Sequence, residues 1–264
     1  MQKPRISVHK WRVLPLTIAP QQYHIDLSEQ LLTAALPEET ATLYWSQAEP
    51  AGLVLGFAQK QSILNPTLAA QQFPIYYRRA GGTAVLVGPG LLSLDVVLPA
   101  GHPLILPDIV ESYHWLGTLW VKTLAQLGVE TRIVSPQEAH AQRDLLKQEE
   151  SRERESILTR ACFGSLSPYE VVVGQRKVVG LDMIRRRTGT LLQAGILLHW
   201  ETERLAQLLG HTPEEQAILR QGLLERAVGL DAMAGQVVSA KELIRAFEQT
   251  LFSSPPRTPG RSIQ

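Results

Sequence analysis

Short apolar runs that are separated by glycine and proline dominate the first hundred residues of the chain. Runs of this length that are rich in β-branched and aromatic residues are typical of strands, and glycine or proline between them favours turns. The pattern therefore predicts four strands, at residues 51–57, 74–79, 83–87 and 91–98.

The apolar pattern takes a helical period between residues 108 and 127. Apolar side chains recur there every three or four positions, which places them on one face of a helix. These positions are Ile109, Tyr113, Leu116, Trp120, Leu124 and Leu127. Gly128 favours the end of this helix, and the segment VETRIVS that follows is predicted to be another strand.

Strands are predicted again in the middle of the chain, and helices follow them to the end. Residues 169–173 and 177–181 flank a glycine-containing turn that is typical of a hairpin, and 190–200 is one more apolar strand. Two helix-capping signals come next, in the segments TPEE from Thr212 and SAKE from Ser239. A strand-rich body that is followed by helices favours an α+β domain with a C-terminal helical extension.

Three stretches are predicted to carry little fixed structure or to lie in solvent. Residues 1–10 are polar and basic and are expected to form a flexible N-terminus, and the Ser/Pro/Gly-rich residues 253–264 a disordered tail. The alternating charges of 142–160 favour a solvated helix or a mobile connection. The folded part would then consist of a body at 11–200 and a helical extension at 201–252.

Composition narrows the class of protein. The 264 residues carry a net charge of +1, which argues against a protein that coats nucleic acid. No window is apolar enough to span a membrane and the start lacks a secretion signal, so we expect a cytoplasmic protein. The single cysteine cannot form an intramolecular disulfide, and the scattered histidines lack metal-ligand spacing, so no metal site is predicted.

Two arginines stand directly before a double glycine. Arg78 and Arg79 precede Gly81-Gly82, where bare backbone N–H groups can approach a ligand and guanidinium groups can hold a phosphate or carboxylate. A tight turn with two solvated arginines explains the same residues, and locally it is the simpler interpretation.

Cys162 and Lys177 are the candidates for covalent chemistry. Cys162 lies outside any apolar run, where a thiolate can act as a nucleophile, and an inert buried cysteine is the alternative. Lys177 enters an apolar strand, where desolvation suits a general acid or base, and Gly180 leaves room for a ligand. A hairpin lysine in water is the alternative. The basic run 185–187 fits either an acidic partner or a solvated turn.

The order of these motifs resembles the lipoate–protein ligase A family. RRAGGTAVLVGPGLLSLDVVLP is similar to the family's R-R-x-[ST]-G-G-G-A-V region, and ACFGSLSPYEVVVGQRKVVG to its A-C-F…S-x-Y-E stretch and the K-[IV]-x-G that follows. ATLYWSQAEPAGLVLGFAQ and GTLLQAGILL resemble two further segments of the family. The resemblance spans about residues 11–252.

The resemblance implies the biotin/lipoate protein ligase fold, in which helices pack on a mixed sheet, with residues 11–200 as the catalytic domain. It also implies medium acyl chains that are destined for one lysine of a lipoyl domain. ATP-dependent ligases of the family use the lysine that Lys177 matches, whereas octanoyltransferases and amidotransferases hold the acyl group on a cysteine where this chain has Cys162. The ACF…SPYE context favours the cysteine branch.

We therefore expect an acyltransferase of lipoate biosynthesis that moves an octanoyl or lipoyl group from a carrier-protein thioester through Cys162 to a lipoyl-domain lysine. Lys177 would favour the thiolate and relay a proton. The strands at 83–87 and 190–198 would wall a tunnel for the acyl tail. Substrate-binding residues are expected at Arg78, Arg79, Gly81, Gly82, Thr83, Ala84, Val85, Gly180, Leu181 and Asp182.

The resemblance also implies partners and alternatives. The expected partners are an acyl carrier protein and lipoyl-domain proteins such as the glycine cleavage H protein or 2-oxoacid dehydrogenase E2, and no cofactor is expected. Two family histidines are missing, near Val87 and at Ala194, and Leu181-Asp182 replaces a small pair after the lysine. These departures leave open an ATP-dependent lipoate ligase and a non-catalytic protein that binds acyl chains or lipoyl domains.

Overall fold

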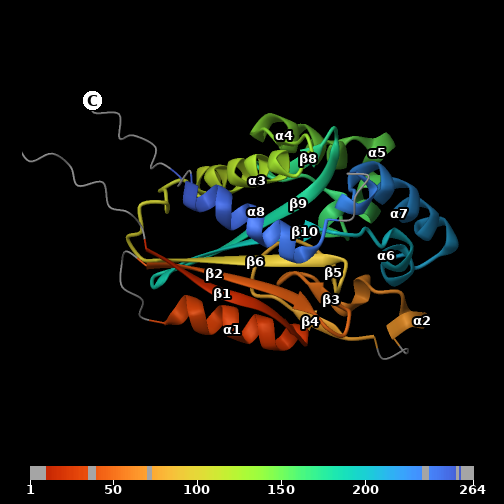
Figure 1. Ribbon diagram of the computed structural model, residues 1–264. Coiled ribbons are helices and arrows are strands. Elements are labelled where there is room, and N and C mark those ends of the chain that lie inside the picture. Colours follow the sequence, from red (N-terminus) through yellow and green to blue (C-terminus); the bar gives the residue numbers. More distant parts are fainter. Residues whose placement is uncertain (1–9, 35–39, 70–72, 234–237, 254–255, 257–264) are drawn as a thin grey trace, which may run out of the picture.

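A mixed β-sheet carries the fold (Figure 1). The computed structural model describes residues 10–34, 40–69, 73–233, 238–253 and 256. Across these residues, seven strands join in the order β1-β2-β6-β10-β9-β8-β7, with β1 and β2 parallel and the other neighbours antiparallel. The strands are β1 (Lys10–Ala19), β2 (Thr40–Ala48), β6 (Leu91–Pro99), β7 (Arg132–Ile133), β8 (Val171–Val173), β9 (Arg176–Arg186) and β10 (Gly189–Leu197).

A three-stranded sheet packs beside one end of the large sheet. Its Val54 and Val87 join an apolar cluster with Leu91 at the start of β6 and Leu197 at the end of β10. The segment with the double glycine connects two strands of this small sheet and is thereby held next to the large one. In the order β4-β3-β5, the strands are β4 (Ile75–Tyr77), β3 (Gly52–Leu55) and β5 (Val85–Val87).

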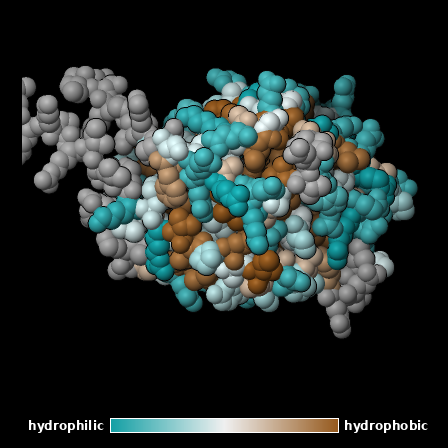
Figure 2. Space-filling view, viewed as in Figure 1, coloured by the Kyte–Doolittle hydropathy of each residue, from teal (hydrophilic) through white to brown (hydrophobic). Residues whose placement is uncertain are grey.

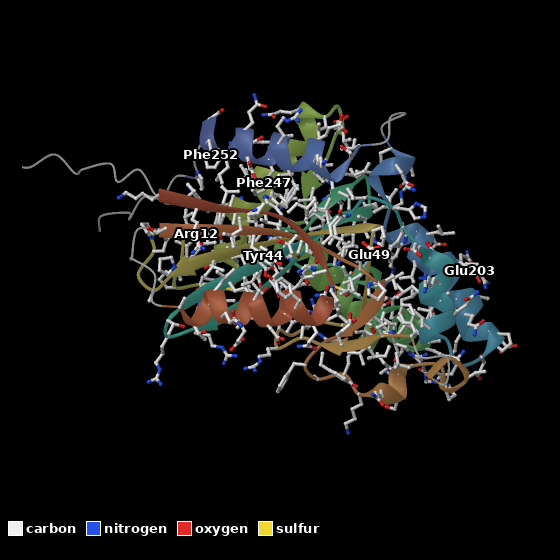
Figure 3. All side chains as sticks on the ribbon, turned by 60° about the horizontal axis from the view of Figure 1, so that its bottom comes forward. Arg12, Tyr44, Glu49, Glu203, Phe247 and Phe252 are labelled. Atoms are coloured by element: carbon white, nitrogen blue, oxygen red, sulfur yellow. The ribbon has the colours of Figure 1, made fainter. Side chains whose placement is uncertain are left out.

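Helices cover both faces of the large sheet (Figure 1). Successive residues of a strand point to opposite faces, so Tyr44 packs with Leu32 of α1 while Trp45 packs on the other side. There its ring meets Trp120 of α3 and Phe247 of α8 at centroid distances of 6.1 and 5.3 Å, and Figure 3 shows Phe247 between α8 and the sheet. The helices are α1 (Gln21–Thr33), α2 (Pro66–Ala69), α3 (His114–Gln126), α4 (Pro136–Asp144), α5 (Glu149–Leu158), α6 (Thr202–Leu209), α7 (Pro213–Arg226) and α8 (Ala240–Ser253).

Short 3-10 turns connect several of these elements. The one that matters for function is η4 (Cys162–Gly164), which follows α5. The others are η1 (Gln61–Ile63), η2 (Glu111–Tyr113), η3 (Leu145–Lys147) and η5 (Leu230–Ala232).

Most predicted elements are confirmed, with different bounds: β3, β4 and β5 are shorter than predicted, whereas β9 is longer and extends to Arg186. The four strands predicted in the first hundred residues are β3, β4, β5 and β6, and the hairpin is β8–β9 with its turn at Gly174, where φ is +60°. Thr212 and Ser239 accept hydrogen bonds from Glu215 and Glu242, as the capping signals predicted. The charged stretch 142–160 is largely helical, in the end of α4, η3 and α5. Several elements, among them β1, α1 and β2, were not predicted; in β1, Pro15 interrupts the apolar pattern.

The long predicted helix begins later than its apolar pattern indicated. Asp108 Oδ1 accepts from the backbone N–H groups of Val110 and Glu111, and this local turn competes with helix formation. The α-helix therefore starts at His114, and Ile109 is 54% exposed instead of lying in the core. Two strand predictions are also too long: 190–200 ends at Leu197, and the strand within VETRIVS is Arg132–Ile133.

The predicted flexible ends fall almost entirely outside the described residues, except that Lys10 begins β1 and Ser253 ends α8. No helix of the described ranges is long and apolar enough to cross a membrane. Hydrophilic side chains alternate with small hydrophobic areas on the face shown in Figure 2.

Candidate active site

The glycine turn and the cysteine segment meet through their backbones. The N–H of Cys162 donates to the carbonyl of Ala84 at 2.7 Å, and the N–H of Ala84 donates to the carbonyl of Arg160 at 3.0 Å. These bonds form an isolated parallel bridge between residues that are more than 70 positions apart in the sequence. The fold thus brings together two regions that the sequence marked separately.

Cys162 is half-buried at the first position of η4. It packs against an apolar cluster that we call the thiol cluster, made of Ala48, Val54, Val87, Leu91, Phe163, Leu197 and Ala227. β5 and β10, the strands that were predicted to wall an acyl tunnel, both contribute to this cluster. Their side chains fill the space beside the cysteine.

Lys177 reaches the same turn from the start of β9. Its side chain is 1% exposed, and Nζ donates to the Cys162 carbonyl oxygen at 2.8 Å and to both carboxylate oxygens of Glu170 at 2.9 Å. Nζ also lies 5.2 Å from the centre of the Phe163 ring, within the range of a cation–π contact. Cys162 and Lys177, the two candidates for covalent chemistry, are therefore neighbours.

Glu170 is a site residue that the sequence analysis did not single out. It is 1% exposed and directly precedes β8. Burial raises the pKa of Glu170, and the nearby Lys177 ammonium counteracts part of that rise. The signal was present in the sequence, since a glutamate next to a run of three valines is expected to be buried and therefore to need a partner.

Gly180 and Leu181 complete the wall around this ion pair. A Cβ at Gly180 would lie 3.5 Å from Glu170 Oε1 and 3.5 Å from the Phe163 ring, so the predicted space over this glycine is occupied by those two side chains. The N–H of Leu181 donates to Glu170 Oε1 at 3.3 Å, and the Leu181 side chain packs against the core under α3 and α8.

Arg78 and Asp182 form a second ion pair on the same side of the sheet. Arg78 Nη1 lies 3.1 Å from Asp182 Oδ2, and Nη2 donates to the carbonyl of Thr83 at 3.1 Å. Burial raises the pKa of Asp182, and the Arg78 guanidinium offsets part of that rise. Gly82, with φ of +80°, lies directly over this arginine, because a Cβ there would come within 2.4 Å of Arg78 Nη2. The arginine therefore supports the glycine turn from below.

The other basic candidates lie elsewhere. Arg79 points away to Glu29 of α1, at 3.2 Å. The basic run 185–187 sits at the far end of β9, eight residues or roughly 25 Å along the strand from Lys177. Its Arg185 donates to the Leu106 carbonyl and to Ser112 Oγ and so fastens a loop.

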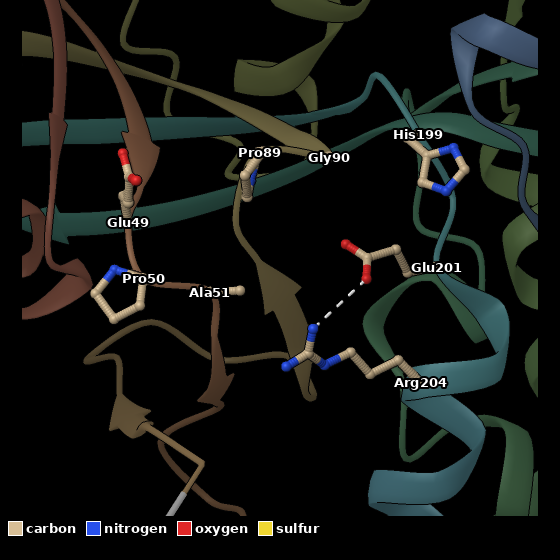
Figure 4. A pocket seen from close by; sticks show the side chains of 8 residues that line it. All are labelled: Glu49, Pro50, Ala51, Pro89, Gly90, His199, Glu201 and Arg204. Atoms are coloured by element: carbon tan, nitrogen blue, oxygen red, sulfur yellow. Dashed lines mark ion pairs between the residues drawn. The ribbon is translucent and has the colours of Figure 1, made fainter.

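An open hollow of about 550 Å³ lies at the end of the large sheet, shown in Figure 4. Its lining residues are Glu49, Pro50, Ala51, Pro89, Gly90, His199, Glu201 and Arg204. A narrow second cavity shares part of this lining and reaches Leu91 and Leu197 of the thiol cluster. No group of three or more possible metal ligands occurs among the described residues.

The amino-acid sequence matches a known protein family. Residues 20–252 match the family model of the lipoyl protein ligase A/B catalytic domain. The chain is 30% identical over 245 residues to the octanoyltransferase LipM of Kyrpidia tusciae, covering 90% of this chain and 85% of the relative. It is 27% identical over 244 residues to the LipM of Exiguobacterium sibiricum, covering 91% and 85%.

Solved structures with a similar fold include lipoate ligases. A bipartite lipoate protein ligase from Thermoplasma acidophilum, described together with its E2 lipoyl domain, superposes with a TM-score of 0.70 at 16% identity, over 92% of this chain and 83% of that one. A lipoate-protein ligase A bound with ATP superposes with a TM-score of 0.65 at 17% identity, over 92% and 85%. The predicted α+β lipoate ligase fold is confirmed, and the chain belongs to the lipoyl protein ligase A/B catalytic domain family.

Proposed function

We propose that this protein is an octanoyltransferase that carries an octanoyl group on Cys162 and delivers it to a lysine of a lipoyl domain. The observation that carries the proposal is the meeting of Cys162, Lys177 and the glycine turn at one place beside an apolar cluster. The choice of an octanoyl group is supported by the names of the relatives, octanoyltransferase LipM. The E2 lipoyl domain of the archaeal ligase supports a lipoyl domain as the acceptor.

The first step transfers the acyl group to the enzyme. The Cys162 thiolate attacks the carbonyl carbon of an octanoyl thioester on an acyl carrier protein, and the bond from that carbon to the carrier's sulfur breaks. The carrier leaves as a thiol after it takes up one proton. No ATP is consumed, since the thioester is already activated.

The second step releases the product. The ε-amine of the acceptor lysine attacks the acyl-enzyme carbonyl, the carbon–sulfur bond to Cys162 breaks, and an amide forms. The amine loses one proton and the cysteine regains it. Because the Cys162 N–H is bonded to Ala84, donors for the oxyanion are expected from the exposed Gly81-Gly82 turn. One such donor contributes about 3 kcal/mol in known enzymes.

The apolar tail would lie in the thiol cluster. Eight carbons at roughly 0.8 kcal/mol per buried CH₂ give several kcal/mol, which suffices to distinguish chain lengths coarsely. Binding requires the cluster's side chains to move apart, because the cavity beside Leu91 and Leu197 holds only about 10 Å³. Arg78, Thr83, Ala84, Val85 and Asp182 surround the glycine turn and would orient the thioester.

Mass spectrometry tests this function directly. The full chain is mixed with octanoyl-carrier protein, and the mass of one octanoyl group should appear on Cys162 and then move to an added lipoyl domain. Cys162→Ser should abolish both events. A chain that stays unmodified with octanoyl-carrier and octanoyl-lipoyl-domain donors contradicts the proposal. Acyl-dependent pyrophosphate release from ATP that survives Cys162→Ser would identify a ligase, and acyl binding without turnover a non-catalytic protein.

A further inference from the structure

The carboxylate of Glu170 is the most heavily engaged acid of the site. Its two oxygens both accept hydrogen bonds from Lys177 Nζ at 2.9 Å. They also accept from the Ser167 N–H at 2.7 Å and the Leu181 N–H at 3.3 Å. The residue is buried together with its cation, since the two side chains are 2% and 1% exposed. A buried carboxylate with this many donors is held in one position.

The backbone next to Glu170 is strained to place it there. Tyr169 has φ of +66°, in the left-handed region that residues with a side chain rarely adopt. Its carbonyl oxygen comes so near α3 that a Cβ at Gly117 would lie 2.2 Å away, so only glycine fits at that position of the helix. The Tyr169 ring stacks on His114 at 4.7 Å, and its hydroxyl donates to Glu111. Strain of this kind persists where the surroundings over-determine it, commonly at functional sites.

Lys177 directs all three N–H groups of its ammonium to hydrogen-bond acceptors. An ammonium group has three N–H donors, and those of Lys177 are directed to the two Glu170 oxygens and to the Cys162 carbonyl. Among the described contacts, Lys177 therefore touches Cys162 through its main chain and not through its sulfur. The charge of the lysine is at the same time balanced by Glu170.

The Cys162 peptide is fastened on both sides as a result. Its N–H is held by Ala84 and its carbonyl by Lys177. We infer that Glu170 is a positioning residue, which balances the charge of Lys177 and keeps it turned onto the Cys162 carbonyl, so that the lysine fixes the nucleophile's backbone while its charge is withheld from the sulfur. The transfer part of this inference rests on the proposed function. It assigns Lys177 a task other than the thiolate stabilisation expected from the sequence.

The charged groups around this pair have partners of their own. Asp182, farther along β9, pairs with Arg78 of the glycine turn, and Arg226 at the end of α7 pairs with Glu155 of α5. The phenol of Tyr113, the last residue of η2, also lies near Glu170 and Arg185, and burial raises its pKa well above the ordinary value. A change at Glu170 therefore leaves the Lys177 charge as the one that is newly unbalanced.

The test measures Cys162 reactivity and transfer in the same variants. Cys162 is the only cysteine of the chain, so alkylation by iodoacetamide reports on it alone. The variants are Glu170→Gln, which keeps the shape and removes the charge, and Glu170→Asp, which keeps the charge. Glu155→Gln is the matched control, because it removes the same charge from the Arg226–Glu155 pair, whose arginine donates to the carbonyl of Gly164 at the other end of the same turn.

In Glu170→Gln the unbalanced ammonium should lower the pH midpoint of alkylation by roughly one unit. Octanoyl transfer should nevertheless fall by about 100-fold, because the lysine no longer holds the cysteine backbone in place. Glu170→Asp should keep the wild-type midpoint and recover part of the transfer rate. Glu155→Gln should keep the midpoint and most of the rate.

A thiol that becomes more reactive while transfer becomes slower is a result that a merely structural carboxylate does not produce. An unchanged alkylation midpoint in Glu170→Gln overturns the inference, whether or not that variant is less stable. So does an equal shift in Glu155→Gln. If the wild-type chain never acquires an octanoyl group, the proposed function fails, and the alkylation series still decides the arrangement of charge.

Discussion

Two buried ion pairs hold the two ends of the same 3-10 turn. Lys177, paired with Glu170, donates to the carbonyl of Cys162 at 2.8 Å. Arg226, paired with Glu155, donates to the carbonyl of Gly164 at 2.6 Å. The turn that carries the cysteine is thus fastened by a cation and a carboxylate at each end, and we call these the lysine clamp and the arginine clamp.

The two clamps differ in the kind of cation and in the other groups that contact each carboxylate. Arginine stays charged at any working pH and donates in a fixed fork, which suits a permanent structural tie. Lysine is a compact point charge on a flexible stem, so its position depends on the acid beside it. Glu155 also has Arg154 at 3.6 Å, whereas the other donors to Glu170 are uncharged backbone N–H groups. Within the described part of the chain, the lysine clamp therefore depends on a single cation, and we expect substitutions there to have the larger effect on stability and on the cysteine turn.

The largest effect is expected when the cations are removed. Lys177→Met leaves Glu170 buried without a cation and should cost about 3–5 kcal/mol of unfolding free energy near neutral pH. Arg226→Met should cost less, because Arg154 remains beside Glu155. Urea unfolding of both variants, alongside the wild type, measures the two losses.

The pH dependence of the same variants sharpens the comparison. Burial raises the pKa of Glu170, and without Lys177 this rise is no longer counteracted. When the pKa of a carboxyl is higher in the folded than in the unfolded chain, the unfolded chain releases the proton first, so the free energy of unfolding falls as the pH rises. The deficit of Lys177→Met should therefore be larger at pH 8 than at pH 5. Equal deficits at the two pH values contradict this explanation.

A third buried acid, Asp95, has neutral hydrogen-bond partners in place of a cation, and its pKa is raised. Asp95 of β6 is 5% exposed and is held by the Gln193 side-chain amide at 2.8 Å and by the Ser28 hydroxyl. Burial raises the pKa of Asp95 to about 6, against an ordinary value of 3.8. The folded state therefore keeps the proton longer, and the wild type should lose up to about 3 kcal/mol between pH 4 and pH 6 from this group alone.

Asp95→Asn removes this titration and nearly keeps the shape of the side chain. The difference in unfolding free energy between wild type and variant should change in favour of the variant as the pH rises through that window. Chemical denaturation at pH 4, 5, 6 and 7 measures the difference. A constant difference across the four values would mean that Asp95 titrates alike in the folded and unfolded chain.

The glycines beside the clamps differ in the space around them. A Cβ at Gly164 would lie 2.0 Å from the carbonyl oxygen of Leu158, which belongs to the backbone and cannot move aside easily. At Gly180 the nearest atoms are 3.5 Å away, an ordinary contact. Gly164→Ala should therefore destabilise by about 1–3 kcal/mol through overpacking, while Gly180→Ala should cost clearly less. Thermal melts rank the pair, and the reverse order would contradict the packing described for the turn.

Local signals in the sequence predicted much of the fold. The apolar runs at β3 to β6 and the caps at Thr212 and Ser239 depend on neighbouring residues, so they could be identified without a structure. Cys162 and Lys177 were also identified from sequence, and their proximity is found in the structure. Their catalytic roles stay predictions.

Features that depend on distant residues could not be identified in this way. Glu170 and Arg226 owe their positions to strands and helices that meet only in the folded chain. Asp182, which was predicted to bind substrate, has its partner in Arg78, more than 100 positions away. The start of α3 was missed for a different reason, because a side chain–backbone turn at Asp108 overrides an apolar period.

The smallest predicted effect concerns the helix that carries the arginine clamp. Thr212 caps α7 by accepting the Glu215 N–H at 3.2 Å, and Arg226 is the last residue of that helix. Thr212→Ala should cost about 1 kcal/mol, and Thr212→Ser should restore most of it because the hydroxyl returns. Since the cap lies at the other end of the helix from the cysteine turn, the alkylation midpoint of Cys162 should stay at its wild-type value in both variants. A midpoint that moves with the cap would show that the arginine clamp, too, tunes the thiol, and the division between a structural and a chemical clamp would have to be given up.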